Sequence, residues 1–293
     1  MSTVKVLSPD VVSKIAAGEV IERPSSVVKE LVENALDAGA TRIEILVKEA
    51  GRSLIHVKDN GYGISQGDIQ NIFLRHATSK ISNVDDLFHI TSLGFRGEAL
   101  YSIAAVSDII LRSKTQEQDS GFEIHIRGGN ILDVKPVGMQ TGTEVEIYEL
   151  FFNTPARRKF LRKNTTEFNH ILSTLIPYTL VFPSCSFMLT SDYKSSQRTV
   201  LHLLTEKNSI NRIARALHVE KDHIIELHQV IPNRDVTMHA FLGDMNIRRT
   251  SKDLQFIFVN GRPVINRLLS YRLNEMYRLL FPSDIYPFFI KTI

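Results

Sequence analysis

The spacing of hydrophobic and polar positions predicts alternating helices and strands in the first half of the chain. Ser8 and Pro9 suit an N-cap and a first helical position, and Gly18 is a stop signal, so a short helix is expected between them. The further elements expected are helices at 24–38, 65–73 and 98–106 and strands at 43–47, 54–57 and 144–148. Adjacent strands with short links favour an α/β layer with antiparallel strands over strict βαβ alternation.

The pattern restarts at Asn153-Thr154-Pro155, where a new helix is expected to begin. We place a domain boundary within residues 200–215, which predicts a first domain at 1–205 and a second at 206–293. The elements expected after the restart are helices at 168–176, 210–217 and 268–280 and strands near Phe187, Ile224 and Val236, at 254–259 and at the C-terminus. The chain stops inside this last apparent strand with no turn after it, so we expect a fragment of a longer protein.

Composition fits a folded chain of two domains, since 293 residues with 43% hydrophobic and 23% charged residues match neither a disordered protein nor a coiled coil. The net charge of +3 means that a nucleic-acid surface would have to be local. A single cysteine, Cys185, excludes a disulfide framework and a Cys-type zinc site.

Neither a secretory signal nor a membrane span is visible in the pattern. Met1–Val6 has no basic region followed by an apolar one, and the most apolar stretch, Leu175–Leu189, is interrupted by Pro177 and Pro183. We therefore expect a cytoplasmic protein.

Glu30 and Asn34 carry the first candidate chemistry, because their i, i+4 spacing places them on one edge of the helix at 24–38. From this helix alone, an ordinary solvated face is the simpler interpretation. The functional interpretation is a carboxylate that polarises a water molecule, one turn from an amide oxygen that can ligate a hard cation such as Mg²⁺.

Asp59-Asn60-Gly61-Tyr62-Gly63 follows a predicted strand and contains Asn-Gly, the leading signal for a tight hairpin. A hairpin requires a second strand, but Ser65-x-x-Asp68 and the apolar residues after it indicate a capped helix. What remains is a carboxylate at the end of a strand, beside two glycines that permit close approach of a ligand. Such an acceptor suits an amino group, for example that of adenine.

Gly94-Phe95-Arg96-Gly97-Glu98-Ala99-Leu100 offers free N–H groups before a predicted helix, and a loop with cations and hydroxyls, Arg75-His76-Ala77-Thr78-Ser79-Lys80, precedes it. Alone, Gly-x-x-Gly is a weak signal that a simple turn explains.

Gly142-Thr143 before a strand could complete a base pocket. The P-loop pattern does not occur. Together these pieces describe an ATP site.

These residues resemble the four nucleotide-binding motifs of the GHKL ATPases, which include gyrase, heat-shock chaperones, histidine kinases and MutL. The longer strings at 15–20, 94–100 and 152–161 closely resemble the bacterial MutL family of DNA mismatch repair proteins, and the resemblance covers essentially the whole chain. It implies a Bergerat-type α/β (α+β) sandwich followed by a domain similar to domain 2 of ribosomal protein S5. It also implies a linker and a C-terminal dimerisation domain that the 293 residues lack.

By this resemblance Glu30 is the general base, Asn34 ligates Mg²⁺ and Asp59 binds the amino group of adenine. Gly61, Gly63 and Thr143 line the base pocket. The phosphate-binding lid comprises Thr78, Ser79, Lys80, Gly94, Phe95, Arg96, Gly97, Glu98, Ala99 and Leu100. The family stretch Asp-Val-Asn-Val-His-Pro-x-Lys, whose lysine reaches the γ-phosphate, is absent from the 293 residues, so we expect impaired catalysis by this chain.

The implied function is a slow, Mg-dependent ATPase that dimerises on ATP binding and links mismatch recognition to repair. The implied partners are DNA, a mismatch-recognition protein of the MutS type, a downstream endonuclease and a helicase, at the nucleoid of a bacterial cytosol. We expect the first helix and the lid to form the ATP-dependent dimer contact. The alternatives are another GHKL ATPase and a catalytically silent DNA-binding scaffold.

Clusters of basic residues are the candidate DNA contacts, and a solvated face is the simpler explanation for each residue taken singly. The candidates are Arg157, Arg158, Lys159, Arg262 and Arg267. The sequence contains no base-reading motif, so binding is expected to be independent of DNA sequence.

Overall fold

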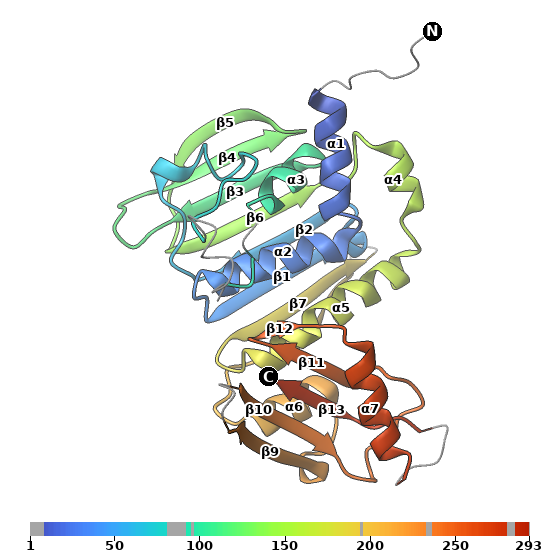
Figure 1. Cartoon of the computed structure of the whole chain (residues 1–293). Helices are drawn as coiled ribbons and strands as arrows, with labels where there is room; N and C mark the ends of the chain where they lie inside the picture. Colours follow the sequence, from blue (N-terminus) through green and yellow to red (C-terminus); the bar gives the residue numbers. More distant parts are fainter. Residues whose placement is uncertain are drawn as a thin grey trace. The chain divides into compact units, whose positions relative to one another are not determined.

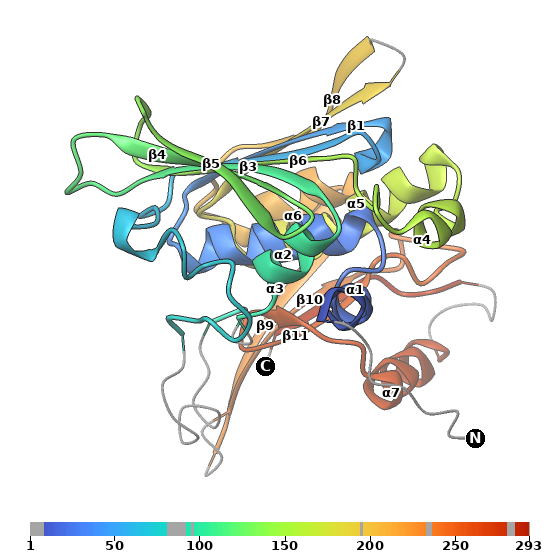
Figure 2. The same cartoon turned by 90° about the horizontal axis from the view of Figure 1, so that it is seen from above.

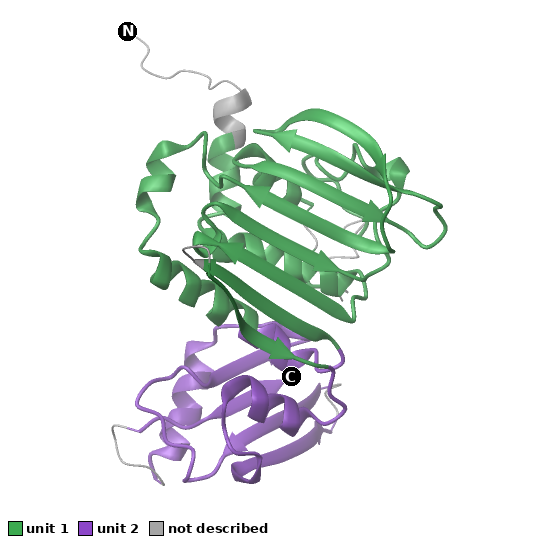
Figure 3. Ribbon diagram, turned by 180° about the vertical axis from the view of Figure 1, so that it is seen from behind, with its two compact units in different colours: residues 1–175, 185–204 green, residues 176–184, 205–293 purple. Residues whose placement is uncertain are grey.

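The structure is a computed structural model that describes residues 9–80, 92–94, 97–193, 196–232, 236–279 and 285–292. The chain forms two compact units (Figure 3). The first comprises residues 1–175 and 185–204, and the second comprises residues 176–184 and 205–293. None of the helices in the described ranges is long and apolar enough to cross a membrane.

The first unit is built on an eight-stranded sheet with the order β5-β4-β3-β6-β2-β1-β7-β8 (Figure 1). Its strands are β1 (Arg42–Lys48), β2 (Leu54–Asp59), β3 (Asp108–Lys114), β4 (Gly121–Arg127), β5 (Asn130–Val137), β6 (Gly142–Tyr148), β7 (Ser186–Tyr193) and β8 (Ser196–Leu203). All neighbours are antiparallel except β1 and β7, which run parallel. The predicted mixed layer with adjacent antiparallel strands is confirmed.

Helices α1, α2 and α3 lie on one side of this sheet (Figure 2). The helices of the first unit are α1 (Pro9–Val20), α2 (Pro24–Asp37), α3 (Ala99–Ala105), α4 (Pro155–Phe160) and the N-terminal part of α5 (Asn164–Val181), and short 3-10 turns occur at Glu49–Gly51 and Gln66–Asp68. Pro24 starts α2 at a position whose N–H would have no helical partner.

The apolar stripe of α2 fixes its orientation on the sheet. Val27, Val28, Leu31, Val32 and Ala35 are at most 4% exposed. The inward residues of the strands beneath are equally buried, and burying one such aliphatic side chain contributes about 1.5–3 kcal/mol. The opposite edge of α2 therefore stays half-buried, and it carries Glu30 and Asn34.

The second unit contains a five-stranded sheet with the order β12-β11-β13-β10-β9. Its elements are α6 (Ser209–Leu217), a 3-10 turn (Lys221–His223), β9 (Ile224–Ile231), β10 (Val236–Gly243), β11 (Gln255–Val259), β12 (Arg262–Pro263), α7 (Arg267–Tyr277) and β13 (Phe289–Thr292). Phe258, Phe288 and Phe289 are fully buried and form its core. β11 and β13 are parallel and the other pairs are antiparallel.

Two predicted elements near the site are wrong in detail. α1 continues past Gly18 to Val20, so Gly18 does not end the helix. Instead, the absence of a side chain at Gly18 leaves room for the guanidinium of Arg157. The segment 65–73 forms a 3-10 turn and further turns in place of a helix, since Ser65 Oγ donates to Asp68 Oδ2 (2.7 Å) instead of accepting a backbone N–H. Its apolar residues Ile69 and Phe73 are nevertheless buried.

Three elements of the later chain also differ from prediction. α5 runs through Pro177 to Val181, because burial of the flanking Leu175 and Tyr178 outweighs the roughly 3 kcal/mol cost of a helical proline. β8 was not predicted, since its alternation is confined to its last buried residues, Leu201 and Leu203. α7 ends at Tyr277, and the predicted end at residue 280 lies outside the described residues.

Candidate functional site

Asp59 ends β2 and pairs with Thr143 of β6, so the two predicted pocket residues lie side by side. The backbone N–H of Gly61 donates to Asp59 Oδ1 (2.8 Å), and the N–H of Thr143 also donates to this carboxylate. Burial raises the pKa of Asp59 to about 6, although both hydrogen bonds oppose the shift. A carboxylate with two N–H donors keeps capacity for a further donor, such as a ligand amino group.

Two glycines of this region pack closely against neighbouring backbone in conformations that other residues rarely adopt. Gly63 has φ +79°, and an added Cβ would lie 2.1 Å from the carbonyl oxygen of Lys114. Gly142 has φ +135°, and its Cβ would lie 2.2 Å from the carbonyl oxygen of Asp59. Both positions require glycine, so the predicted importance of Gly63 has a direct steric basis.

Ser113 links the parts of this pocket and was missed by the sequence analysis. Its hydroxyl donates to the carbonyl of Gly142 (2.9 Å) and accepts from the N–H of Ile64 (2.8 Å). Thr143 Oγ1 lies 2.9 Å from Ser113 Oγ and must then be the donor of that pair. The available sequence signal was a serine at the apolar position that follows Ile109 and Leu111 in the alternation of β3.

Asp37 organises a second cluster, at the C-terminal end of α2. Its Oδ1 accepts the N–H of Leu93 (2.7 Å) and its Oδ2 accepts the N–H of Gly94 (3.0 Å). Lys80 Nζ donates to Asp37 Oδ2 (2.5 Å) and to Asn34 Oδ1 (3.1 Å). The structure thus brings together Asn34, Lys80 and Gly94, as predicted from sequence, through Asp37, which was not. Its i, i+3 spacing from Asn34 was the overlooked signal.

Glu30, one turn before Asn34, contacts the ammonium of Lys29 (3.1 Å). Lys29 also donates to Glu33 (3.1 Å), whose side chain is almost fully buried. Burial alone would lower the pKa of Lys29, but the charges and hydrogen bonds of Glu30 and Glu33 raise it above its usual value. Lys29 therefore stays charged and positions the Glu30 carboxylate.

The remaining predicted phosphate residues lie around the start of α3. Thr78 Oγ1 accepts the N–H of Lys80 (3.1 Å), and the neighbouring Ser79 is exposed. Glu98 contacts Arg75 (3.4 Å) and His76 (3.3 Å). Ala99 and Leu100 form the first turn of α3, and Gly97 packs against the backbone of Ala77. Phe95 and Arg96 lie outside the described residues.

The predicted DNA contacts occupy different environments. Arg158 and Lys159 are exposed on α4, whereas the Arg157 guanidinium lies against Gly18 with its Nη1 buried. In the second unit, Arg267 is exposed at the first position of α7, and Arg262 is half-buried in β12.

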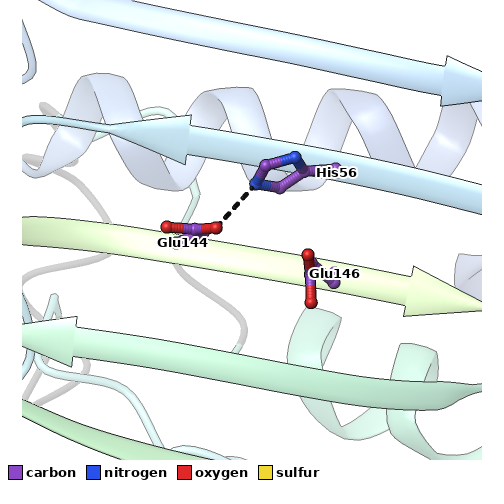
Figure 4. Close-up of side chains that lie close together, drawn as sticks. All are labelled: His56, Glu144 and Glu146. Atoms are coloured by element: carbon purple, nitrogen blue, oxygen red, sulfur yellow. Dashed lines mark ion pairs between the residues drawn. The ribbon is translucent and has the colours of Figure 1, made fainter. Parts of the chain in front are cut away.

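His56, Glu144 and Glu146 converge on the first sheet, with ligand atoms within 4.8 Å of one another (Figure 4). His56 Nε2 lies 3.1 Å from Glu144. Arg112 contacts both glutamates (3.2 and 3.6 Å), and Lys58 contacts Glu144 (3.6 Å). Because these cations balance the carboxylates, we assign no metal to this group.

Two family models match the chain. Residues 21–131 match the histidine kinase-, DNA gyrase B- and HSP90-like ATPases, and residues 216–293 match the C-terminal domain of DNA mismatch repair proteins. The first match covers α2 and β2, which carry Asn34 and Asp59. The second covers most of the second unit.

Curated relatives that match nearly the whole chain are DNA mismatch repair proteins, in agreement with both family models. The DNA mismatch repair protein MutL of Thermodesulfovibrio yellowstonii is 43% identical over 99% of this chain and 52% of its own length. That of Koribacter versatilis is 39% identical over 98% of this chain and 48% of its own length. The chain spans about half the length of these curated relatives.

A solved structure is similar over both units. The Aquifex aeolicus MutL ATPase domain, complexed with ADP, has a TM-score of 0.71 and 34% sequence identity. The match covers 94% of this chain and 93% of that domain.

The steric requirement at Gly63 generates a stability prediction. We expect Gly63→Ala to lower the free energy of unfolding by more than about 2 kcal/mol, because it adds a backbone clash to the strain of a positive φ. Gly138→Ala, where no atom lies within 4 Å of an added Cβ and φ is not positive, is the matched control and should change stability by less than about 0.5 kcal/mol. Urea unfolding measures both, and equal effects would contradict the assignment.

Proposed function

Because the chain belongs to the MutL family of DNA mismatch repair proteins, we propose that its first unit binds and slowly hydrolyses ATP in DNA mismatch repair. The observation that carries the proposal is Asp59, a partly buried carboxylate with remaining acceptor capacity at a glycine-lined strand end. This arrangement suits the exocyclic amino group of adenine. The ADP in the Aquifex aeolicus structure supports the same ligand class.

Asn34 and its neighbours fit a magnesium nucleotide. The amide oxygen of Asn34 and the carboxylate of Asp37 are hard oxygen donors, and Lys80 and the Gly94 region supply positive charge for phosphates. When bound, Mg²⁺ neutralises charge on the phosphate oxygens. Asn34 would hold the ion, and Gly61, Gly63 and Thr143 would enclose the base.

Glu30 is proposed as the general base that accepts a proton from the attacking water. Lys29 holds its carboxylate, and Lys29 is in turn held by the buried Glu33. This ion pair keeps the carboxylate in one orientation.

For the whole protein we propose a matchmaker role. ATP binding would drive homodimerisation, and the dimer would bind DNA. It would couple a mismatch-recognition protein of the MutS type to an endonuclease and a helicase. This would take place at nucleoid DNA in a bacterial cytosol. The MutL relatives, which match nearly all of this chain, support this proposal, and so does the mismatch repair family model that matches residues 216–293. The exposed cations of α4 and α7 support a DNA surface.

Substitutions of Asn34 and Glu30 separate binding from chemistry. We expect Asn34→Ala to abolish Mg-ATP binding, because the amide oxygen is proposed to ligate the magnesium ion in the bound complex before any reaction takes place. Glu30→Ala should keep binding and lose about 10²-fold or more of kcat, because a general base acts only as the water attacks. Calorimetry and single-turnover hydrolysis distinguish the two, with the exposed Asn71→Ala as control. Equal loss of nucleotide affinity in both variants would refute the roles.

The raised pKa of Asp59 predicts a pH dependence of nucleotide affinity. Protonation weakens the carboxylate as an acceptor for the adenine amino group, so affinity should be full above the pKa of about 6 and fall as the pH drops through it, by up to about tenfold at one pH unit below. Fluorescence titration with an ATP analogue between pH 5 and 8 measures this. Asp59→Asn should bind weakly at every pH, and a profile in this variant like that of the wild type would exclude Asp59 as the titrating group.

The DNA proposal predicts salt-sensitive binding that depends on single exposed cations. Arg267→Glu should weaken duplex DNA binding at low salt and reduce the log–log salt slope by about one unit per lost phosphate contact. ATP affinity should not change, because Arg267 belongs to the second unit. Lys221→Glu, an equal charge reversal at another exposed site of that unit, is the control. If both variants bind DNA alike, Arg267 makes no specific contact.

A further inference from the structure

Lys80 lies where the proposed function needs a metal ion. Its ammonium is 3.1 Å from Asn34 Oδ1, the atom proposed to ligate Mg²⁺, and 2.5 Å from Asp37 Oδ2. The Lys80 side chain is 19% exposed and that of Asp37 is 9% exposed. The ion pair is therefore largely removed from water, where the two charges attract each other more strongly than at the surface.

Asp37 explains why a cation is held at this place. The carboxylate already accepts the N–H groups of Leu93 and Gly94, so its position is fixed by backbone from a distant part of the chain. A carboxylate this buried is costly without a counter-charge, and Lys80 supplies it. A second of the three donors of the ammonium goes to the amide oxygen of Asn34.

Lys80 and a magnesium ion cannot share Asn34 Oδ1. Magnesium binds its oxygen ligands at about 2.0–2.1 Å, and an ammonium on the same oxygen would place two cations in direct repulsion. One of them must leave when the other binds. The phosphates of a nucleotide are the one feature of the proposed ligand that offers Lys80 an equivalent negative partner.

We propose that Lys80 is a resident counter-cation of Asn34 and Asp37, and that the magnesium ion of a bound nucleotide replaces it while the ammonium transfers to the phosphates. This inference rests on the proposed function and adds a regulatory property to it. Among the described residues the hydrogen bonds of the Lys80 ammonium go to Asn34 and Asp37, so free Mg²⁺ would have to displace it with no phosphate to receive it. Cation and nucleotide therefore bind as one unit, and the Asp37 carboxylate holds a cation in both states.

Lys80→Met tests the replacement with a measurement that does not depend on hydrolysis. The thioether side chain keeps the length and apolar body but removes the charge, so Asn34 and Asp37 become available to a divalent ion. Titration of the nucleotide-free chain with Mn²⁺, followed by the electron paramagnetic resonance signal of the free ion, should show affinity on the order of tenfold higher than in wild type. Affinity for ATP should change in the opposite direction, because the phosphates lose a cation.

Lys163→Met is the matched control, because it removes the same charge from an exposed position of the same unit, away from the carboxylates discussed above. Its Mn²⁺ affinity should equal that of the wild type. The double variant Lys80→Met with Asp37→Asn should lose the gain, and circular dichroism checks that each variant is folded. Unchanged or weaker Mn²⁺ binding by folded Lys80→Met would overturn the proposal, as would an equal gain in Lys163→Met.

Titration of the wild type with a non-hydrolysable ATP analogue and Mg²⁺ separates this inference from the function beneath it. Failure of the wild type to bind the analogue would refute the proposed nucleotide site itself. Binding of the analogue by the wild type, together with no gain of Mn²⁺ affinity in Lys80→Met, would refute only the replacement of Lys80 by the metal ion.

Discussion

Packing of α2 on the sheet is the constraint on which the candidate site depends. The apolar stripe of the helix is buried against β2 and its neighbours, so the helix cannot rotate without exposing Val27, Val28 and Leu31. Because the helix cannot turn about its axis, its polar edge also has a fixed orientation. Glu30, Asn34 and Asp37 lie along this edge. The same sheet ends at Asp59, so one packed interface orients both halves of the site.

The two aspartates of this site, Asp59 and Asp37, differ in the groups that stabilise their buried carboxylates. This difference fits the ligands proposed for them. Asp59 receives backbone N–H groups only from Gly61 and Thr143 among its described partners, and its pKa rises to about 6. It is therefore suited to accept from a neutral amino group. Asp37 receives two N–H groups and the ammonium of Lys80, which makes its surroundings a place for cations.

Much of the fold could be predicted from periodicity, and the failures have local causes. The helix at 24–38 and the strands beside it were recognised because their hydrophobic residues recur at helical or alternating spacing, and the structure buries those same positions. The segment 65–73 has the residues of a capped helix, but the Ser65 hydroxyl bonds a side chain and the backbone forms turns. β8 escaped prediction because an edge strand exposes most of its side chains and shows little alternation.

The sequence by itself determined the groups that lie near one another along the chain. Glu30 and Asn34 share a helix edge by their spacing, and Asp59, Gly61 and Gly63 follow one strand, so short-range geometry identifies them. Only the tertiary structure decided which groups meet across long separations. Asp37 reaches the N–H of Gly94, 57 residues away, and Ser113 joins Ile64 to Gly142 across β3 and β6. Such contacts follow from strand order and helix packing, which local periodicity does not encode.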